Sequence, residues 1–143
     1  NRDSHRAFEA LRARFPTWEA LRDAPTAEVE ATIPMVTWPE QKAPRIQAVL
    51  RGVAARAGSL SLDFLADWPV PEARAWLEAL PGVGPKTSAA VLSFSSLRGV
   101  ALPVDSHHHR VAQRLGLIPA NMDVGPSHAA LAALLPPDWD AQK

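Results

Sequence analysis

The chain has 143 residues, of which 47% are hydrophobic and 21% charged, so it is long enough for one modest domain with a buried core. Its 15 basic and 15 acidic side chains cancel, and it lacks the basic excess common in nucleic-acid-binding proteins. No apolar run reaches the ~18 residues of a membrane span, no secretory signal pattern occurs, and the absence of cysteine excludes disulfides and thiolate metal sites within these residues.

Apolar side chains recur at helical spacing along most of the chain, and prolines fall at the edges of these segments. The first such segment covers residues 3–14. Thr17 and Thr26 each precede a further short periodic segment, and both are expected to cap a helix. The sequence therefore predicts three short helices in its first third.

The longest periodic segment covers residues 40–57 and ends at Gly58, a typical C-terminal stop for a helix. Pro44 lies inside this segment, and we expect it to kink the first turn or to delay the start of the helix. The apolar face predicted for this helix comprises Ile46, Val49, Leu50 and Val53.

A short turn after Ser61 and four more helices complete the predicted elements, the helices covering residues 71–80, 85–97, 105–115 and 126–135. No segment shows sustained alternation of β-branched residues, so strands are not expected and the fold class is all-α. A loop is predicted from Ile118 to Gly125, and a domain seam near Pro103.

The sequence LPGVGPKT at residues 80–87 predicts a tight hairpin between two helices. Glycine tolerates positive φ angles and lets another backbone come close, which explains Gly82 and Gly84. Val83 can pack back between the helices, and Pro85 suits the first position of the second helix. Unpaired N–H groups would then face outward at the positive end of a helix dipole, a site that attracts a phosphate directly or through a bound cation.

Lys86 falls in the first turn of the second helix, where a cation opposes the helix dipole. The same field, with desolvation in a cleft, disfavours the ammonium form and makes a nucleophilic amine more available. A surface lysine that contacts a phosphate is an equally good interpretation.

Asp105 begins a later helix and is a favoured N-cap residue. As an ionised carboxylate it can also deprotonate a nucleophile or stabilise an oxocarbenium-like sugar, and the two roles are compatible.

Three consecutive histidines, at 107–109, point in different directions on a helix and cannot bind one metal ion together. We expect His108 and His109 to be ordinary exposed or partly buried side chains, and His107 to help order the helix start.

Most of the five tryptophans are expected in the core, and Trp38, in a loop, is the best candidate for exposure and for stacking on bases. The tryptophans are Trp18, Trp38, Trp68, Trp76 and Trp139.

The hairpin at 80–87, followed by ValAspSerHis at 104–107 and ArgVal at 110–111, resembles the helix–hairpin–helix (HhH-GPD) DNA glycosylases, and most closely their endonuclease III branch. The resemblance implies a multi-helix glycosylase fold with one helix–hairpin–helix motif at about 71–97. Residues 1–103 would form most of the six-helix barrel domain and residues 104–143 the start of a second helical domain. We expect truncation at both ends, because the family's pocket glutamine and its four cysteines are missing; a cluster-free relative is the alternative.

The same resemblance implies a bifunctional DNA glycosylase/AP lyase, in which Lys86 attacks the sugar carbon of a flipped nucleotide and Asp105 assists. Double-stranded DNA with oxidised pyrimidines or abasic sites would be the substrate. For cofactors, the resemblance implies no metal site in this chain, a [4Fe–4S] cluster only in the longer family protein, and a monovalent cation at the hairpin. It also implies a monomer with a cytoplasmic, nucleoid-associated location. DNA contacts are expected from Gly82, Val83, Gly84, Lys86 and Thr87.

Two other functions stay open. One is a non-catalytic DNA-binding scaffold that keeps the hairpin. The other is a monofunctional glycosylase in which Lys86 only contacts phosphate.

Overall fold

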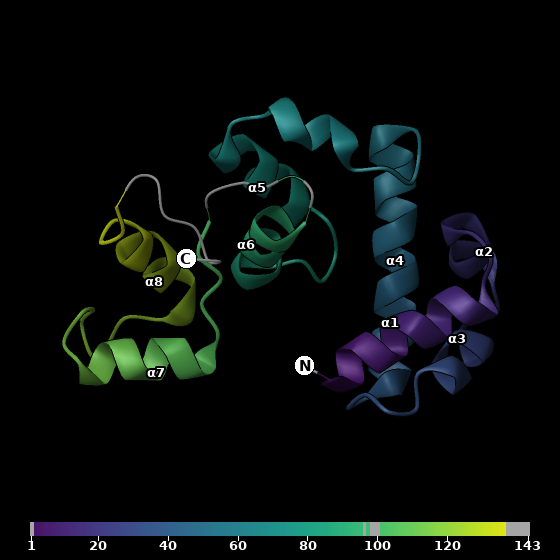
Figure 1. The fold of residues 1–143 in the computed structure, drawn as a ribbon, viewed down its shortest axis with the longest axis horizontal. Helices are drawn as coiled ribbons and strands as arrows, with labels where there is room; N and C mark the ends of the chain where they lie inside the picture. The colour runs from purple at the N-terminus through teal and green to yellow at the C-terminus, as the bar shows by residue number, and fades with distance from the viewer. Residues whose placement is uncertain (1, 96, 98–100, 137–143) are drawn as a thin grey trace. The chain divides into compact units, whose positions relative to one another are not determined.

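The computed structural model describes residues 2–95, 97 and 101–136, and these residues form eight α-helices and one 3-10 turn (Figure 1). No strand occurs among them, which confirms the all-α class. In this part of the chain no helix is both long and apolar enough to cross a lipid bilayer. The chain divides into two compact units, Asn1–Leu62 with Leu80–Gly82, and Asp63–Ala79 with Val83–Lys143. This division does not coincide with the seam expected near Pro103, and the proposed domain limits stay a prediction.

The first unit contains four helices: α1 (Arg2–Arg14), α2 (Trp18–Asp23), α3 (Thr26–Thr32) and α4 (Pro39–Ala57) (Figure 1). Ala7 and Leu11, at helical spacing on α1, face a core, whereas Phe8 beside them is 44% exposed. That core is lined by Ala7, Leu11, Phe15, Leu21, Val29, Ile33 and Ala43. Apolar burial at helical spacing therefore accounts for the packing of α1, α3 and α4.

The two predicted threonine caps have different outcomes. Thr17 is the N-cap of α2, and its hydroxyl accepts a hydrogen bond from the amide of Ala20 at 3.0 Å, as expected. Thr26 is not a cap: it is the first residue of α3, whose N-cap is Pro25. Its hydroxyl instead donates to Gln47 Oε1 at 2.8 Å, so a long-range partner replaces the local one.

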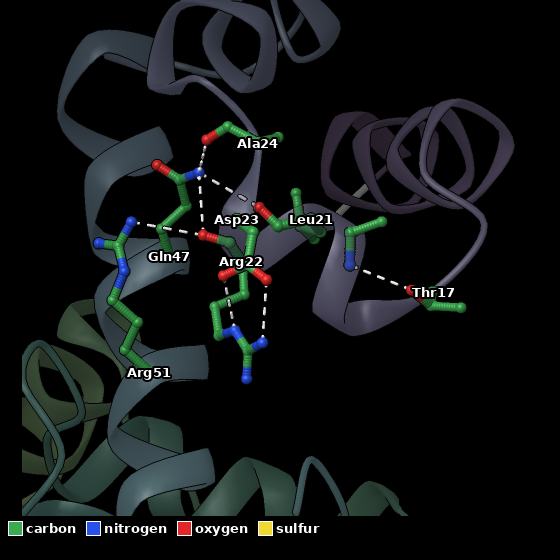
Figure 2. Close-up of polar contacts among 8 residues, drawn as sticks. Thr17, Leu21, Arg22, Asp23, Ala24, Gln47 and Arg51 are labelled. Carbon is green, nitrogen blue, oxygen red and sulfur yellow. Dashed lines mark hydrogen bonds and ion pairs between the residues drawn. The ribbon is translucent and has the colours of Figure 1, made fainter.

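Gln47, a polar residue on the predicted apolar face of α4, is fully buried and joins α4 to the α2–α3 connection (Figure 2). Its side-chain amide donates to the carbonyl oxygens of Leu21 at 3.2 Å and Ala24 at 2.6 Å. Its own carbonyl accepts from Thr26. Gln47 thereby satisfies carbonyl groups that the end of a helix leaves without an intrahelical partner.

α4 begins at Pro39, so Pro44 does not delay its start. Gly58 ends the helix as predicted, with φ +76° and its N–H bonded to the carbonyl of Ala54. Trp38 precedes the helix with φ +57°, the only non-glycine residue with positive φ in the described chain, and is 62% exposed, as expected. The core role expected for most tryptophans is wrong for Trp18 and Trp68, each 41% exposed. Trp139 lies outside the described residues.

The second unit contains the 3-10 turn Asp63–Asp67 and four helices: α5 (Val70–Glu78), α6 (Pro85–Phe94), α7 (Ser106–Arg114) and α8 (Val124–Ala132). α6 ends at Phe94 rather than at the predicted residue 97, because the backbone of Ser95 is extended. α8 begins inside the predicted loop, because Pro126 is tolerated within a first turn rather than only at its start. The core of α7 and α8 is lined by Val104, Ala112, Ile118 and Leu131.

Candidate catalytic pair and hairpin

The two glycines of the hairpin between α5 and α6 have different backbone conformations. Gly82 has φ +79°, the left-handed conformation in which glycine is favoured. Gly84 has φ −106° and ψ −174°, an extended conformation open to any residue, so the positive φ expected there is absent. A Cβ atom built on Gly84 would meet nothing within 4 Å. Neither backbone conformation nor internal packing therefore requires glycine at position 84.

α6 begins at Pro85, as predicted, and Gly84 is its N-cap, so no side chain caps the start of this helix. The amides of the first helical turn lack intrahelical partners and lie at the positive end of the helix dipole. The side chains of Lys86 and Thr87 in that turn are both exposed. The start of α6 thus presents backbone donors and a cation to solvent together.

A polar network that the sequence analysis did not single out connects the two helices of the hairpin. The Arg74 guanidinium on α5 donates to Ser88 Oγ at 3.3 Å and to the Pro85 carbonyl at 3.4 Å, and pairs with Glu78 at 3.3 Å. The Ser88 hydroxyl, fully buried on α6, lies 2.6 Å from Glu78 Oε1. Because Pro85 and Ser88 flank Lys86 and Thr87, this network fixes the turn that carries the predicted nucleophile.

Asp105 is the N-cap of α7, as predicted, and its Oδ1 atom accepts from the amides of His107 at 2.9 Å and His108 at 2.8 Å. The pKa of its carboxyl is lowered, mainly by the His108 hydrogen bond and further by the charge of His108, the His107 amide and the charge of Lys86, against an opposing effect of desolvation. The charge of Lys86 is the smallest of these contributions. The two predicted catalytic residues occur in one unit, and neither is sealed from solvent.

The three histidines behave as separate side chains. His107 and His108 are exposed, and His107 orders the helix start only through its backbone amide. His109 is half-buried, and its Nε2 atom lies 2.6 Å from the carbonyl oxygen of Met122. Among residues 2–95, 97 and 101–136, no three histidine, aspartate or glutamate side chains gather as metal ligands. With no cysteine in the chain, these residues do not fit a [4Fe–4S] cluster, and a cluster in a longer protein stays a prediction.

Comparisons with known proteins place the chain in a family. Residues 4–137 match the model of the HhH-GPD superfamily base excision DNA repair proteins. The endonuclease III of Synechocystis is 33% identical over 133 residues, 92% of this chain and 56% of that protein. The DNA glycosylase/AP lyase ROS1 of Arabidopsis thaliana is 35% identical over 102 residues, 71% of this chain and 7% of that protein.

The fold is also similar to a solved structure of a trapped endonuclease III–DNA covalent intermediate, with a TM-score of 0.74 and 27% identity. That similarity covers 91% of this chain and 56% of the solved chain. The chain spans about half the length of the curated relatives that it matches nearly from end to end. It belongs to the HhH-GPD superfamily of base excision DNA repair proteins and is similar to endonuclease III within it.

Proposed function

We propose that this chain carries the catalytic pair of a bifunctional DNA N-glycosylase/AP lyase that acts on damaged bases, with oxidised pyrimidines as the substrate class. The observation that carries the proposal is that an exposed amine, Lys86, and a partly exposed carboxylate, Asp105, occur in one compact unit, each at the start of a helix. The charge of Lys86 also contributes to the lowered pKa of Asp105. The names of the relatives support both activities: one is a DNA glycosylase/AP lyase, and the solved neighbour is a covalent DNA intermediate.

In this mechanism the damaged nucleotide leaves the stack and places its sugar between the two side chains. Lys86 Nζ attacks C1′ as the bond from C1′ to the base breaks, Asp105 takes a proton from the amine, and the departing base takes up a proton from water. The proton on Asp105 passes to the ring oxygen O4′ as the sugar ring opens to a Schiff base between Lys86 and C1′. Water then takes a C2′ proton, the bond from C3′ to its oxygen breaks, and the phosphate leaves, which nicks the strand on the 3′ side. Water then hydrolyses the Schiff base and frees the lysine.

The hairpin would hold the DNA by its backbone. The uncapped amides at the start of α6 are suited to donate hydrogen bonds to a phosphate oxygen. A monovalent cation at the hairpin, held by backbone carbonyl oxygens rather than by amides, would be a second link to a phosphate. The missing side chain at Gly84 leaves open space beside those amides for an approaching strand. Such contacts position DNA but carry no sequence information, so recognition of the damaged base falls to other residues.

Borohydride trapping on DNA with one abasic site tests the proposal. The wild-type chain should form a covalent adduct that peptide mapping assigns to Lys86. The Lys86→Arg variant keeps the positive charge but cannot form a Schiff base, and should give no adduct while binding the DNA as tightly. Lys42→Ala, which removes an exposed lysine on α4, serves as the control and should trap normally.

Other results would favour the alternative functions. A wild-type chain that binds abasic DNA without any adduct would favour the scaffold. Release of a damaged base by both the wild-type chain and Lys86→Arg, with no strand nicking, would favour a monofunctional glycosylase in which Lys86 contacts phosphate.

A further inference from the structure

His128 on α8 is a buried histidine with a hydrogen-bond partner at each ring nitrogen. It is 3% exposed. Its Nε2 atom accepts from the backbone N–H of Val104 at 3.0 Å, and its Nδ1 atom lies 3.0 Å from the carbonyl oxygen of Val124. A backbone N–H can only donate, so Nε2 must be unprotonated, and Nδ1 carries the hydrogen and donates to Val124. The contacts therefore select one neutral tautomer of the ring.

The bond to Val104 matters because of where Val104 lies. Val104 is fully buried and directly precedes Asp105, the N-cap of α7. A buried N–H group needs a partner, and the side chain of His128 supplies it from a helix that begins about twenty residues later. At the other end of the same segment, the Ser93 hydroxyl donates to the Ala101 carbonyl. The stretch that leads into Asp105 is thus tied to α6 and to α8.

The hydrogen bonds of Asp105 itself do not fix its position relative to α6. Its carboxylate bonds to the amides of His107 and His108, which orient it relative to α7. Those local bonds do not determine where the start of α7 lies relative to α6, which carries Lys86. The hydrogen bond from Val104 to His128 supplies a long-range restraint on the residue next to Asp105.

We infer that His128 is a positioning residue for Asp105: as a neutral imidazole it holds the Val104 peptide so that the adjacent carboxylate faces Lys86. The inference rests on the proposed function, because the chemistry of Asp105 is part of that proposal. It assigns His128 no contact with DNA or with the reacting sugar.

Two substitutions separate the hydrogen bond from simple packing. His128→Phe keeps a buried ring of similar size but leaves the Val104 N–H without a partner. His128→Gln retains a side-chain oxygen that can accept that hydrogen bond and an amide that can donate to Val124. His5→Gln, on the exposed surface of α1, is the matched control.

Two quantities would be measured on the full chain: the single-turnover rate of adduct trapping at saturating protein, and the affinity for DNA with a non-reactive abasic analogue. We expect His128→Phe to slow trapping roughly tenfold or more while affinity stays within about twofold. His128→Gln should trap within about threefold of wild type. Wild-type trapping by His128→Phe, or an equal loss in both variants, would overturn the inference.

Amide hydrogen exchange at Val104 gives a readout without DNA. The Val104 amide should be strongly protected in the wild type and in His128→Gln, and should exchange at least tenfold faster in His128→Phe while the amides of α1 remain unchanged. If the exchange rate at Val104 were unchanged in His128→Phe, the positioning role of His128 would be overturned and the proposed function would stand. A wild-type chain that shows this protection but forms no adduct would overturn the proposed function instead.

Discussion

The amide of His108 donates to Asp105 Oδ1 at 2.8 Å, so the proposed general base is also the cap of the helix that follows it. The carboxylate is 34% exposed, which leaves room for a substrate beside the cap. One oxygen atom receives both amide bonds, from His107 and His108. The capping and catalytic roles of Asp105 can therefore be separated by changing the charge of the side chain without changing its shape.

Asp105→Asn should abolish most of the chemistry and leave the fold intact. Asparagine caps helices about as well as aspartate, so the melting temperature should stay close to that of the wild type. Without a carboxylate the trapping rate should fall at least about 100-fold, within the range of general acid–base contributions. Asp105→Ala, the comparison variant, should lose the cap as well and melt at a lower temperature. If the asparagine variant instead lost DNA affinity to the same extent as its rate, Asp105 would be a structural cap only.

The stability that Asp105 contributes should depend on pH in one direction. Its pKa in the folded chain lies below the ordinary value of about 3.9, chiefly because of the hydrogen bond from the His108 amide. The contribution is therefore complete above the unfolded pKa and is lost as the pH falls through the folded value. Below about pH 5 the difference in melting temperature between wild type and Asp105→Asn should change in favour of the variant as the pH falls. A difference that grows in favour of the wild type on acidification would contradict this assignment.

Local signals predicted much of the fold. Helical spacing and the end signal at Gly58 located the long helix α4, and the hairpin residues located the start of α6 at Pro85. Thr17 and Asp105 cap helices within their own neighbourhood, so their roles are visible in a few adjacent residues. At these two caps the partners lie within one turn, and the adjacent residues were sufficient to predict them.

Long-range polar contacts could not be predicted in this way. Thr26 has the features of a cap, yet its hydroxyl bonds to Gln47 on another helix. Gln47, Ser88 and His128 are polar residues on buried helix faces, where periodicity predicts apolar side chains. Each has at least one partner on another segment, which only the folded arrangement brings close.

Alanine at the two hairpin glycines should have opposite effects. Gly84→Ala should fold at least as stably as wild type, because the backbone is extended and the added methyl meets open space. It should weaken binding to DNA of every sequence alike, since the methyl would occupy the approach to the α6 amides. Gly82→Ala should instead cost about 1 kcal/mol of stability, because φ is +79°. Chemical denaturation and titration of labelled duplexes would measure both, and unchanged affinity in Gly84→Ala would exclude the hairpin as the anchor.

Gln47→Leu should destabilise the first unit despite its similar volume. Leucine would leave the buried carbonyl of Leu21, the partly buried carbonyl of Ala24 and the hydroxyl of Thr26 without this partner. We expect a loss of about 3 kcal/mol in the free energy of unfolding. Gln41→Leu, an exposed glutamine on the same helix, should change it by less than about 0.5 kcal/mol. Equal effects of the two substitutions in urea denaturation would show that the Gln47 network contributes no net stability.

Trp38 combines a left-handed backbone with an exposed aromatic ring, a conformation that costs a side chain about 1–2 kcal/mol. The free energy of unfolding should therefore be about 1 kcal/mol higher for Trp38→Gly than for Trp38→Ala, because only glycine removes the backbone strain. An exposed aromatic ring on a strained backbone is suited to stacking on a base, which contributes about 1–3 kcal/mol to the binding of a single base. Both variants should accordingly lose DNA affinity by a similar factor, measured on duplexes with an abasic analogue. Wild-type affinity in both would assign Trp38 no role in binding, whereas a loss in alanine alone would trace the effect to backbone strain.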